Sequence, residues 1–392
     1  MYGLFAAYYA VNMTCIHEQP NWPAFTWDAE TLASRLADIR HRQGRLLGRM
    51  ESLGFELRRE ASLETLTTEV VASSAIEGET LNPKEVRSSI ARKLGIEIGG
   101  YVSVGRDVEG IVEMMIDATR NFDRPLTRER LFDWHAALFP TGRTGMQWIT
   151  VGAWRPASAG PMQVVSGPAG KERLHFEAPA ADRLEAETAR FLGWFEEGTA
   201  TDPVLKAGTA HLWFVTIHPS EDGNGRIARA IADMALARAD GMRERFYSMS
   251  AQIETERADY YAQLERQQRG SLDITGWLAW FLDCLGRAID SAEGTLSAVL
   301  YKAEFWGIAN REPVSGRQRL VLNRMLDPAF EGYMNTSKYA KLAKCSNDTA
   351  LRDIGDLVDR GLLVKNPSGG RSTSYRLPTR EHLARTRQTR PY

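Results

Sequence analysis

Cysteine is scarce in this chain of 392 residues, which has only Cys15, Cys284 and Cys345. An odd number of widely spaced cysteines fits neither a disulfide framework nor a CxxC metal knot. Net charge is also small, because 49 basic residues face 50 acidic ones, giving a formal charge of -1. So balanced a chain lacks the overall charge of a nucleic-acid coat or a membrane-surface protein. We therefore expect a cytoplasmic protein without a membrane partner.

Long hydrophobic runs are missing as well. The apolar stretch Met1 to Asn12 has no basic region before it and is too short to span a bilayer. We interpret residues 1–17 as an N-terminal extension and leave open whether translation starts at Met1 or Met13. No internal repeat or low-complexity tract is apparent.

Helical periodicity is what the sequence does have. Apolar residues recur at spacings of three and four over 28–53 and 57–76, which predicts a helical hairpin, and the pattern returns over much of 108–298. A length of 392 residues indicates two or three domains. We expect an all-α class with domains at 18–100, 101–300 and 312–380.

The C-terminal region has a pattern of its own. Three short helices are predicted at 318–326, 336–344 and 347–360, the last capped by Ser346 and closed by Gly361, and two β-like runs follow. This order is typical of a winged helix, a fold that often binds DNA. The third helix carries Arg352 and Arg360 among four aspartates, which suit phosphate poorly. DNA binding, protein docking and support of a homodimer all stay open.

The most informative stretch runs from Ile217 to Arg229. A helix pattern ends at Ile217, a glycine-rich turn follows, and a second helix begins near Asn224. Unpaired amide groups at a helix start attract anions. His218 is placed to act as a base, and Asp222 offers a hard oxygen ligand for Mg²⁺.

Two arginines follow in the first turn of this second helix. Arg226 and Arg229 lie three residues apart on one face, where positive charge opposes the helix dipole. An anion bound there would offset that cost. Base, oxygen ligand and arginines together predict a phosphate site.

The segment HPSEDGNGRIAR resembles the signature of the Fic family. The resemblance implies a Fic/Fido helical core with a β-hairpin flap, and a protein adenylyltransferase that uses ATP and Mg²⁺. It implies that His218 takes the proton from a Ser, Thr or Tyr hydroxyl, which then attacks the α-phosphate. The nucleotide-binding residues it implies are Asp222, Gly223, Asn224, Gly225, Arg226 and Arg229, with Asp222 also holding the metal.

One position departs from that family. The third signature residue is aromatic in the family, whereas here it is Ser220. Loss of a buried phenylalanine costs about 3–5 kcal/mol and leaves a cavity. We therefore expect a looser loop than in relatives.

A second resemblance precedes the core. Ser73 and Glu77 stand four residues apart, on one helical face, and Gly78 follows. This resembles the Fic inhibitory motif, which implies that Glu77 pairs with Arg229 and removes the γ-phosphate contact. The alternative is a solvated glutamate at a helix end.

The long loop at 140–178 resembles the Fic flap. The resemblance implies that Met162, Gln163, Val164 and Val165 hold the target segment by strand addition, although core packing of these residues is an equal alternative. Farther on, the resemblance implies that Tyr260 or Tyr261 closes the adenine pocket, and we prefer Tyr261.

The function expected from sequence is adenylyl transfer to a protein, the chain itself included. Two rivals remain. A degraded core could sense nucleotide while the winged helix binds an operator, which Ser220 would favour. Alternatively, Glu77 could position a water to remove AMP from a modified protein.

Overall fold

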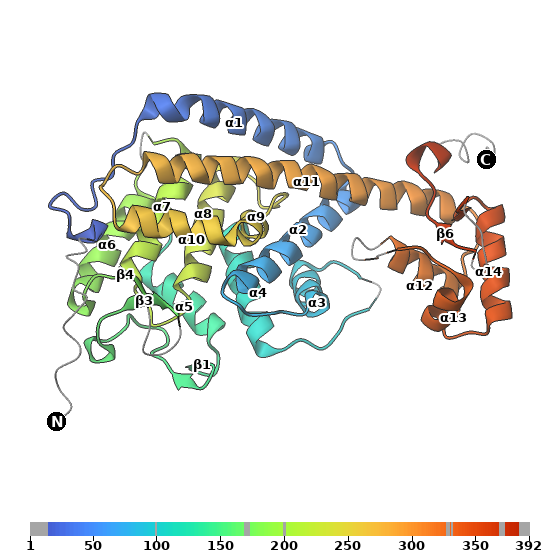
Figure 1. Ribbon diagram of the computed structural model, residues 1–392, viewed down its shortest axis with the longest axis horizontal. Helices are drawn as coiled ribbons and strands as arrows, with labels where there is room; N and C mark the ends of the chain where they lie inside the picture. Colours follow the sequence, from blue (N-terminus) through green and yellow to red (C-terminus); the bar gives the residue numbers. More distant parts are fainter. Residues whose placement is uncertain are drawn as a thin grey trace. The chain divides into compact units, whose positions relative to one another are not determined.

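The computed structural model describes residues 15–98, 100–167, 173–198, 201–326, 330, 332–367 and 373–383. The chain forms two compact units, Met1–Glu293 and Gly294–Tyr392, and the division falls inside the long helix α11 (Thr275–Ala309). Figure 1 shows a mostly helical chain, and the described residues add only three two-stranded antiparallel sheets. The expected all-α class with a hairpin is therefore confirmed. The expectations on Met1 and Met13, and residues 368–370 between the two predicted β-like runs, lie outside the described residues.

The first unit holds most of the helices. In chain order its elements are η1 (Ile16–Glu18), α1 (Ala29–Glu51), α2 (Phe55–Ile76), α3 (Pro83–Leu94), α4 (Arg106–Arg120), α5 (Arg128–Leu138), β1 (Arg143–Thr144), β2 (Gln147–Trp148), η2 (Ala157–Ala159), β3 (Gln163–Ser166), β4 (Arg173–Glu177), η3 (Ala181–Arg183), α6 (Leu184–Glu196), α7 (Pro203–Ile217), α8 (Asn224–Asp240), α9 (Met249–Thr255), α10 (Arg257–Gln268) and the start of α11. The helices predicted over 28–53 and 57–76 correspond to α1 and α2.

Short polar side chains set where several of these helices begin. The carboxylate of Asp28 accepts the amide hydrogens of Glu30 and Thr31 at the start of α1, and Asp202 caps α7 just ahead of Pro203. Such caps satisfy amides that have no partner within the helix. The cap at Asp202 fixes the residue at which α7 begins, and α7 leads into the loop that starts with His218.

Helix α7 is the centre of the first unit. Only Pro203 and Lys206 among its residues are not buried, and it packs along α8. A helix that is apolar all round is stable only inside a core. The loop between α7 and α8 is consequently anchored at both ends by buried helices.

Helix α1 lies alongside the first part of α11 (Figure 1). Arg35, Arg42 and Arg45 pair with Asp283, Asp290 and Glu293, each 248 residues further on. A constant offset means that the two helices run parallel and in register. These exposed pairs contribute little stability each, about 0–1 kcal/mol, but they define the register.

The second unit continues from α11 with α12 (Gly316–Met325), α13 (Thr336–Ala343), α14 (Asn347–Asp359), β5 (Val364–Lys365) and β6 (Tyr375–Arg376). Its own core is made of fully buried side chains from these elements, among them Phe305, Leu322, Tyr339, Ile354, Leu357 and Leu363. The side chain of Ser346 accepts the Thr349 amide, and Gly361 adopts a φ of 73° directly after α14. Three helices followed by an antiparallel pair is the order that the sequence predicted.

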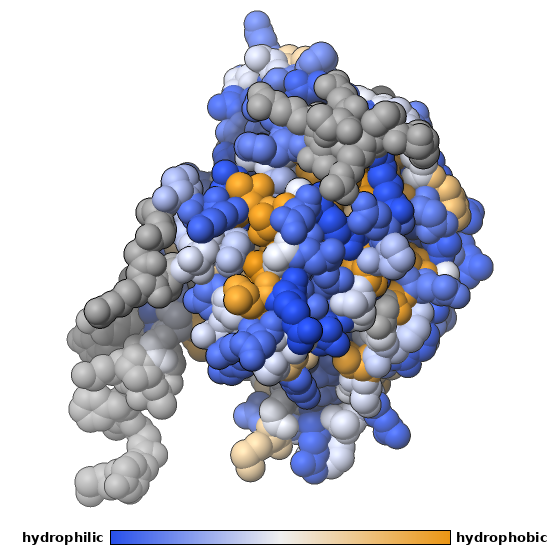
Figure 2. Space-filling model, turned by 90° about the vertical axis from the view of Figure 1, so that its right-hand side faces the viewer, coloured by the Kyte–Doolittle hydropathy of each residue, from blue (hydrophilic) through white to orange (hydrophobic). Residues whose placement is uncertain are grey.

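No helix among the described residues combines the length and the apolar character that crossing a bilayer requires. On the face drawn in Figure 2, hydrophobic residues form small patches between hydrophilic ones.

Candidate functional site

The loop between α7 and α8 makes a tight turn. His218 ends α7 in a left-handed conformation, with φ 50° and ψ 58°, and Gly223 has φ 80° immediately before α8. A Cβ on Gly223 would also lie 2.9 Å from the ring of Phe139. Only glycine suits both conditions. The turn leaves His218 beside the amino end of α8.

Two side chains hold the main chain of this loop. Asn224 Nδ2 donates to the carbonyl oxygen of Ser220 at 2.8 Å, while its Oδ1 accepts the Ser220 amide at 2.9 Å. From the other side, Arg155 Nε donates to the carbonyl of His218 and the Arg155 amide donates to that of Pro219, both at 2.9 Å. Because these atoms are buried or half-buried, their hydrogen bonds fix the loop.

These bonds bear on the expectation of a loosened loop. Ser220 is buried, with 3% of its surface exposed. Its main-chain N–H and C=O groups are both hydrogen-bonded to Asn224, although position 220 has no aromatic side chain. Arg155 was not found from the sequence, since it stands in a loop far from the motif. The effect of Ser220 on activity stays a prediction.

His218 has the chemistry of a base. Its Nδ1 lies 3.1 Å from the carbonyl oxygen of Val215, which can only accept, so Nδ1 carries the proton in the neutral ring. The other nitrogen, Nε2, then has a free lone pair. Burial lowers the pKa of His218 and the charge of Arg155 adds to this, although the Val215 carbonyl, Glu77 and Asp222 oppose it. The imidazole is thus neutral and able to take a proton near pH 7.

Asp222 is the candidate metal ligand. One of its oxygens accepts the hydroxyl of Thr144 at 2.5 Å, and the other accepts the amide of Gly223 at 2.6 Å. No three His, Cys, Asp or Glu side chains converge on a metal position in the part of the chain that is described. A single carboxylate on a side chain that is 38% exposed fits Mg²⁺, which often binds one or two carboxylates together with substrate phosphates.

Arg229 is buried and bound to the end of α2. Its Nη2 lies 2.8 Å from Glu77 Oε1 and 2.8 Å from the Ser73 carbonyl oxygen, and its Nε donates to the Ser73 hydroxyl at 3.0 Å. Burial tends to lower the pKa of Arg229, but the charge of Glu77 and its hydrogen bond raise it overall. The pairing that the sequence suggested is present.

Glu77 also lies against the start of α8. A Cβ added to Gly225 would come 2.2 Å from Glu77 Oε1, so the carboxylate occupies the space that a side chain at position 225 would need. The amino end of a helix favours negative charge. Glu77 therefore places a carboxylate at an anion-binding position.

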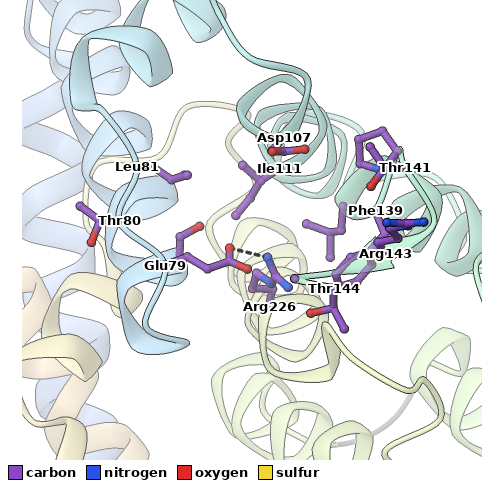
Figure 3. Close-up of a pocket in the computed structure, with 14 residues that line it drawn as sticks. Glu79, Thr80, Leu81, Asp107, Ile111, Phe139, Thr141, Arg143, Thr144 and Arg226 are labelled. Atoms are coloured by element: carbon purple, nitrogen blue, oxygen red, sulfur yellow. Dashed lines mark hydrogen bonds and ion pairs between the residues drawn. The ribbon is translucent and has the colours of Figure 1, made fainter. Parts of the chain in front are cut away.

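Arg226 has an acidic partner of its own. Its Nη1 lies 2.7 Å from Glu79 Oε2, and its guanidinium stacks over the ring of Phe139 at 5.1 Å (Figure 3). Gly78, with a φ of 87°, turns the chain between Glu77 and Glu79. Sequence reasoning missed Glu79, although its signal was present: a second carboxylate two residues after the first. Arg226 and Arg229, both in the first turns of α8, are thus paired with acids that directly follow α2.

A cavity of about 770 Å³ lies beside the loop between α7 and α8, and its lining does not include Asp222, Arg226 or Arg229. It is lined by the start of α8, the end of α7, the β3–β4 hairpin and α10, and includes Glu77, His218 and Gly225. Tyr261 borders it with 40% of its surface exposed, and its hydroxyl donates to the Ile76 carbonyl at 3.2 Å. Tyr260 is 1% exposed and bonded to His211. Of the two tyrosines, Tyr261 is the one with accessible surface for a ligand.

The β3–β4 hairpin, called the flap from here on, divides its side chains between two faces. Met162 and Val164 pack against Cys15, Phe176 and Ala178, as core packing would require. Gln163, Val165 and Ser166 are exposed. Within the described residues β3 pairs only with β4, so its other edge is open to a further strand.

In the second unit, one of the two arginines considered for DNA is engaged internally. Arg360 is 9% exposed, and its Nη2 donates to the carbonyls of Ala309 and Glu312 at 2.9 and 3.1 Å. A guanidinium committed to main-chain carbonyls is not free to bind phosphate. Arg352 is then the arginine of α14 left to consider, beside four aspartates, of which Asp353 pairs with Arg317.

Comparison with known families places two models on the chain. Residues 15–96 match a domain of unknown function, DUF4172, and residues 125–236 match the Fic/DOC family. The second range includes the loop, Asp222 and both arginines.

Among curated proteins, the chain is 29% identical over 212 residues to protein adenylyltransferase fic-1 of Caenorhabditis briggsae, covering 53% of this chain and 38% of that protein. It is 26% identical over 255 residues to protein adenylyltransferase Fic of Culex quinquefasciatus, covering 62% and 45%. The match thus spans less than half the length of either relative.

Among solved structures, the chain resembles a Fic family protein from Desulfovibrio desulfuricans G20, with a TM-score of 0.50 and 20% identity over 91% of this chain and 98% of that one. It also resembles a Fic domain containing signaling protein from Bacteroides thetaiotaomicron VPI-5482, with a TM-score of 0.50 and 21% identity over 66% and 97%. At these identities the likeness concerns the fold.

Proposed function

We propose that this chain, whose residues 125–236 match the Fic/DOC family, transfers AMP from ATP to a hydroxyl group of a protein and is inhibited by its own Glu77. The observation that carries the proposal is the cavity of about 770 Å³, where a neutral histidine, the amino end of α8 and an open strand edge meet. A base, an anion site and a docking edge are the parts that such a transfer needs.

Each residue of the site has a separate role in the transfer. The free Nε2 of His218 takes the proton of the incoming hydroxyl as its oxygen attacks the α-phosphate, and pyrophosphate leaves. The amides at the start of α8, with Asn224 fixing the loop, bind phosphate oxygens. Arg226 and Arg229 stabilise the charge that develops on the leaving group. When bound at Asp222, Mg²⁺ would neutralise phosphate charge.

Target docking uses the flap. A hydroxyl reaches His218 only if the target segment is held in a fixed orientation, and main-chain pairing with the open edge of β3 would do this. The outward residues Gln163 and Val165 would contact target side chains, and the ring of Tyr261 would contact the adenine.

Inhibition follows from the contacts of Glu77. Its carboxylate holds Arg229 and lies against Gly225, so a γ-phosphate cannot use either position. A nucleotide bound with its terminal phosphate displaced would not present the α-phosphate in line with the hydroxyl. Removal of the carboxylate frees both positions.

The test is incubation with Mg²⁺ and ATP labelled in its α-phosphate. We expect Glu77→Gly to label protein at least about tenfold faster than wild type, which corresponds to about 1.4 kcal/mol of transition-state stabilisation. Glu51→Gly is the matched control, because it removes an exposed glutamate at the end of another helix. ATP binding without label on any protein, in either variant, would exclude the transferase and favour a nucleotide-sensing role.

The partner of the second unit is a separate question. Its three helices and hairpin suit a winged helix, and a protein or homodimer partner fits the acidic α14 better than DNA does. Binding that weakens steeply with added salt would indicate DNA instead.

A further inference from the structure

Three side chains outside the base and phosphate site form a hydrogen-bonded series. Ser166 Oγ lies 2.5 Å from His175 Nε2, and His175 Nδ1 lies 2.7 Å from Glu265 Oε2. Ser166 stands on β3, His175 on β4 and Glu265 on α10. The series therefore brings together a hydroxyl, an imidazole and a carboxylate from three separate elements.

The position of the proton on His175 follows from its carboxylate partner, Glu265. A carboxylate only accepts, so His175 Nδ1 donates to Glu265 and carries the proton. In the neutral ring Nε2 then has a lone pair, which accepts the Ser166 hydroxyl. In an activated serine the hydroxyl is generally hydrogen-bonded to a base, and a third group orients that base.

Two arginines keep Glu265 ionised. Its Oε1 lies 2.7 Å from Arg173 Nη2 and 3.0 Å from Arg269 Nη1. Burial raises the pKa of Glu265, but the hydrogen bonds from His175 and Arg173 outweigh burial and lower it overall. The carboxylate can thus stabilise an imidazolium formed at His175.

Pairing of Glu265 with His175 and Arg173 ties the flap to α10, but the fold does not need the contact between Ser166 and His175. Ser166 is exposed, so water would satisfy its hydroxyl if His175 were absent. The series faces a cavity instead: Ser166, His175 and Glu265 line the same space as His218 and Gly225. Ser166 therefore stands on the wall of the cavity in which the transfer is proposed to take place.

We propose that Ser166 is an internal acceptor of AMP, with His175 as its base and Glu265 as the residue that positions His175, an inference that rests on the proposed adenylyl transfer. The Ser166 oxygen forms a bond to the α-phosphorus of ATP while the bond from that phosphorus to pyrophosphate breaks. The hydroxyl proton passes to His175 Nε2, and pyrophosphate leaves. The product is a phosphodiester that links AMP to the flap.

This modification would act on the flap itself. Ser166 is a residue of β3, the strand whose open edge is the proposed docking edge. AMP on that side chain would fill part of the cavity and place a negative charge beside the docking edge. Self-modification at Ser166 therefore limits the docking of further targets.

The first arm of the test needs no ATP. A fluorophosphonate probe reacts with an activated serine as fluoride leaves, and mass spectrometry of peptides locates the adduct. We expect an adduct on Ser166 whose formation falls at least about a hundredfold in His175→Ala, the usual scale for loss of a general base. Ser158→Ala is the matched control, because Ser158 is an exposed serine that does not line the cavity.

The second arm uses ATP and Mg²⁺ with the Glu77→Gly protein. We expect AMP on the peptide that carries Ser166, reduced about a hundredfold by a further His175→Ala change and less by Glu265→Gln, which keeps an acceptor but loses the charge. A His218→Ala change is measured beside these two, because AMP on Ser166 should depend more strongly on His175 than on His218.

The outcomes separate the two proposals. AMP found on other hydroxyls but not on Ser166 overturns the internal acceptor and leaves the transferase standing. AMP on Ser166 that needs His218 and not His175 overturns the assignment of His175. No AMP on any protein contradicts the transferase itself, and an absent fluorophosphonate adduct on Ser166 independently shows that the serine is not activated.

Discussion

Glu77 Oε1 and Arg229 Nη2 lie 2.8 Å apart although 152 residues separate them in the chain. The arginine is almost fully buried, with 2% of its side chain exposed, whereas 31% of the glutamate is exposed. This asymmetry matters, because an arginine that loses its partner remains in the protein interior, while the carboxylate already has access to solvent.

The first prediction concerns stability. Glu77→Gln should lower the free energy of unfolding by about 1–2 kcal/mol, because Arg229 loses its ionic partner. This is less than the 3–5 kcal/mol typical of a broken buried pair, since Glu77 is partly exposed and Ser73 still binds the guanidinium. Urea unfolding of wild type and variant measures the difference. ATP with Mg²⁺ should restore much of the loss, because phosphate replaces the carboxylate. A variant that ATP does not stabilise more than wild type would contradict this account of the site.

The second prediction concerns the base. In a Ser166→Ala background, where only hydroxyls delivered to His218 are counted, His218→Ala should reduce labelling by about 10²–10⁴-fold while ATP affinity changes little. His41→Ala, at an exposed histidine of α1, is the control. Retention of most of the labelling rate would remove His218 from the mechanism.

The pH profile gives a third and independent prediction. Only the neutral imidazole accepts a proton, so the rate falls as pH drops through the pKa of His218 in the folded protein. Burial, with Arg155, lowers that pKa from its ordinary value of 6.5. The acidic limb of the labelling rate in the Glu77→Gly, Ser166→Ala protein should therefore have its midpoint below 6.5. A midpoint above this value would show that His218 is stabilised in its charged form.

A fourth prediction concerns Glu79. Its carboxylate is half exposed and pairs with Arg226 at 2.7 Å, so the pair is worth no more than about 1 kcal/mol. Glu79→Gln should accordingly raise labelling by up to about fivefold, and its effect should add to that of Glu77→Gly because the two acids bind different arginines. Labelling rates of the single and double variants decide this. A decrease in Glu79→Gln would mean that Glu79 supports Arg226 instead of competing with phosphate.

The fifth prediction tests the loop. Arg155→Lys keeps a positive charge but cannot donate to both the His218 and Pro179 carbonyls as the guanidinium does. A shift of about 1 Å in His218 can cost about a hundredfold in rate. We expect a loss of that order in labelling with a much smaller change in ATP affinity. Arg35→Lys, at an exposed pair of α1, provides the comparison. Equal loss of rate and of ATP affinity would show instead that the phosphate site itself has moved.

Short stretches of sequence determined a large part of this site. His218, Asp222, Asn224 and the two arginines lie within one loop and one helical turn, so their spacing alone places them together. Ser73 and Glu77 share a face because a helix repeats every 3.6 residues. A glycine-rich turn before the second helix was also readable, whereas the positive φ of Gly223 was seen only in the structure.

Tertiary structure alone decided the rest. Arg155 reaches the loop from 63 residues upstream, and Glu265 meets His175 across 90 residues. No local periodicity encodes such pairs, because they depend on how α10, the flap and α7 pack. The pairing of Glu77 with Arg229 depends on both sequence and tertiary structure. Helical periodicity places each residue on one face of its own helix, and only the packing of α2 against α8 brings the two charges within 2.8 Å.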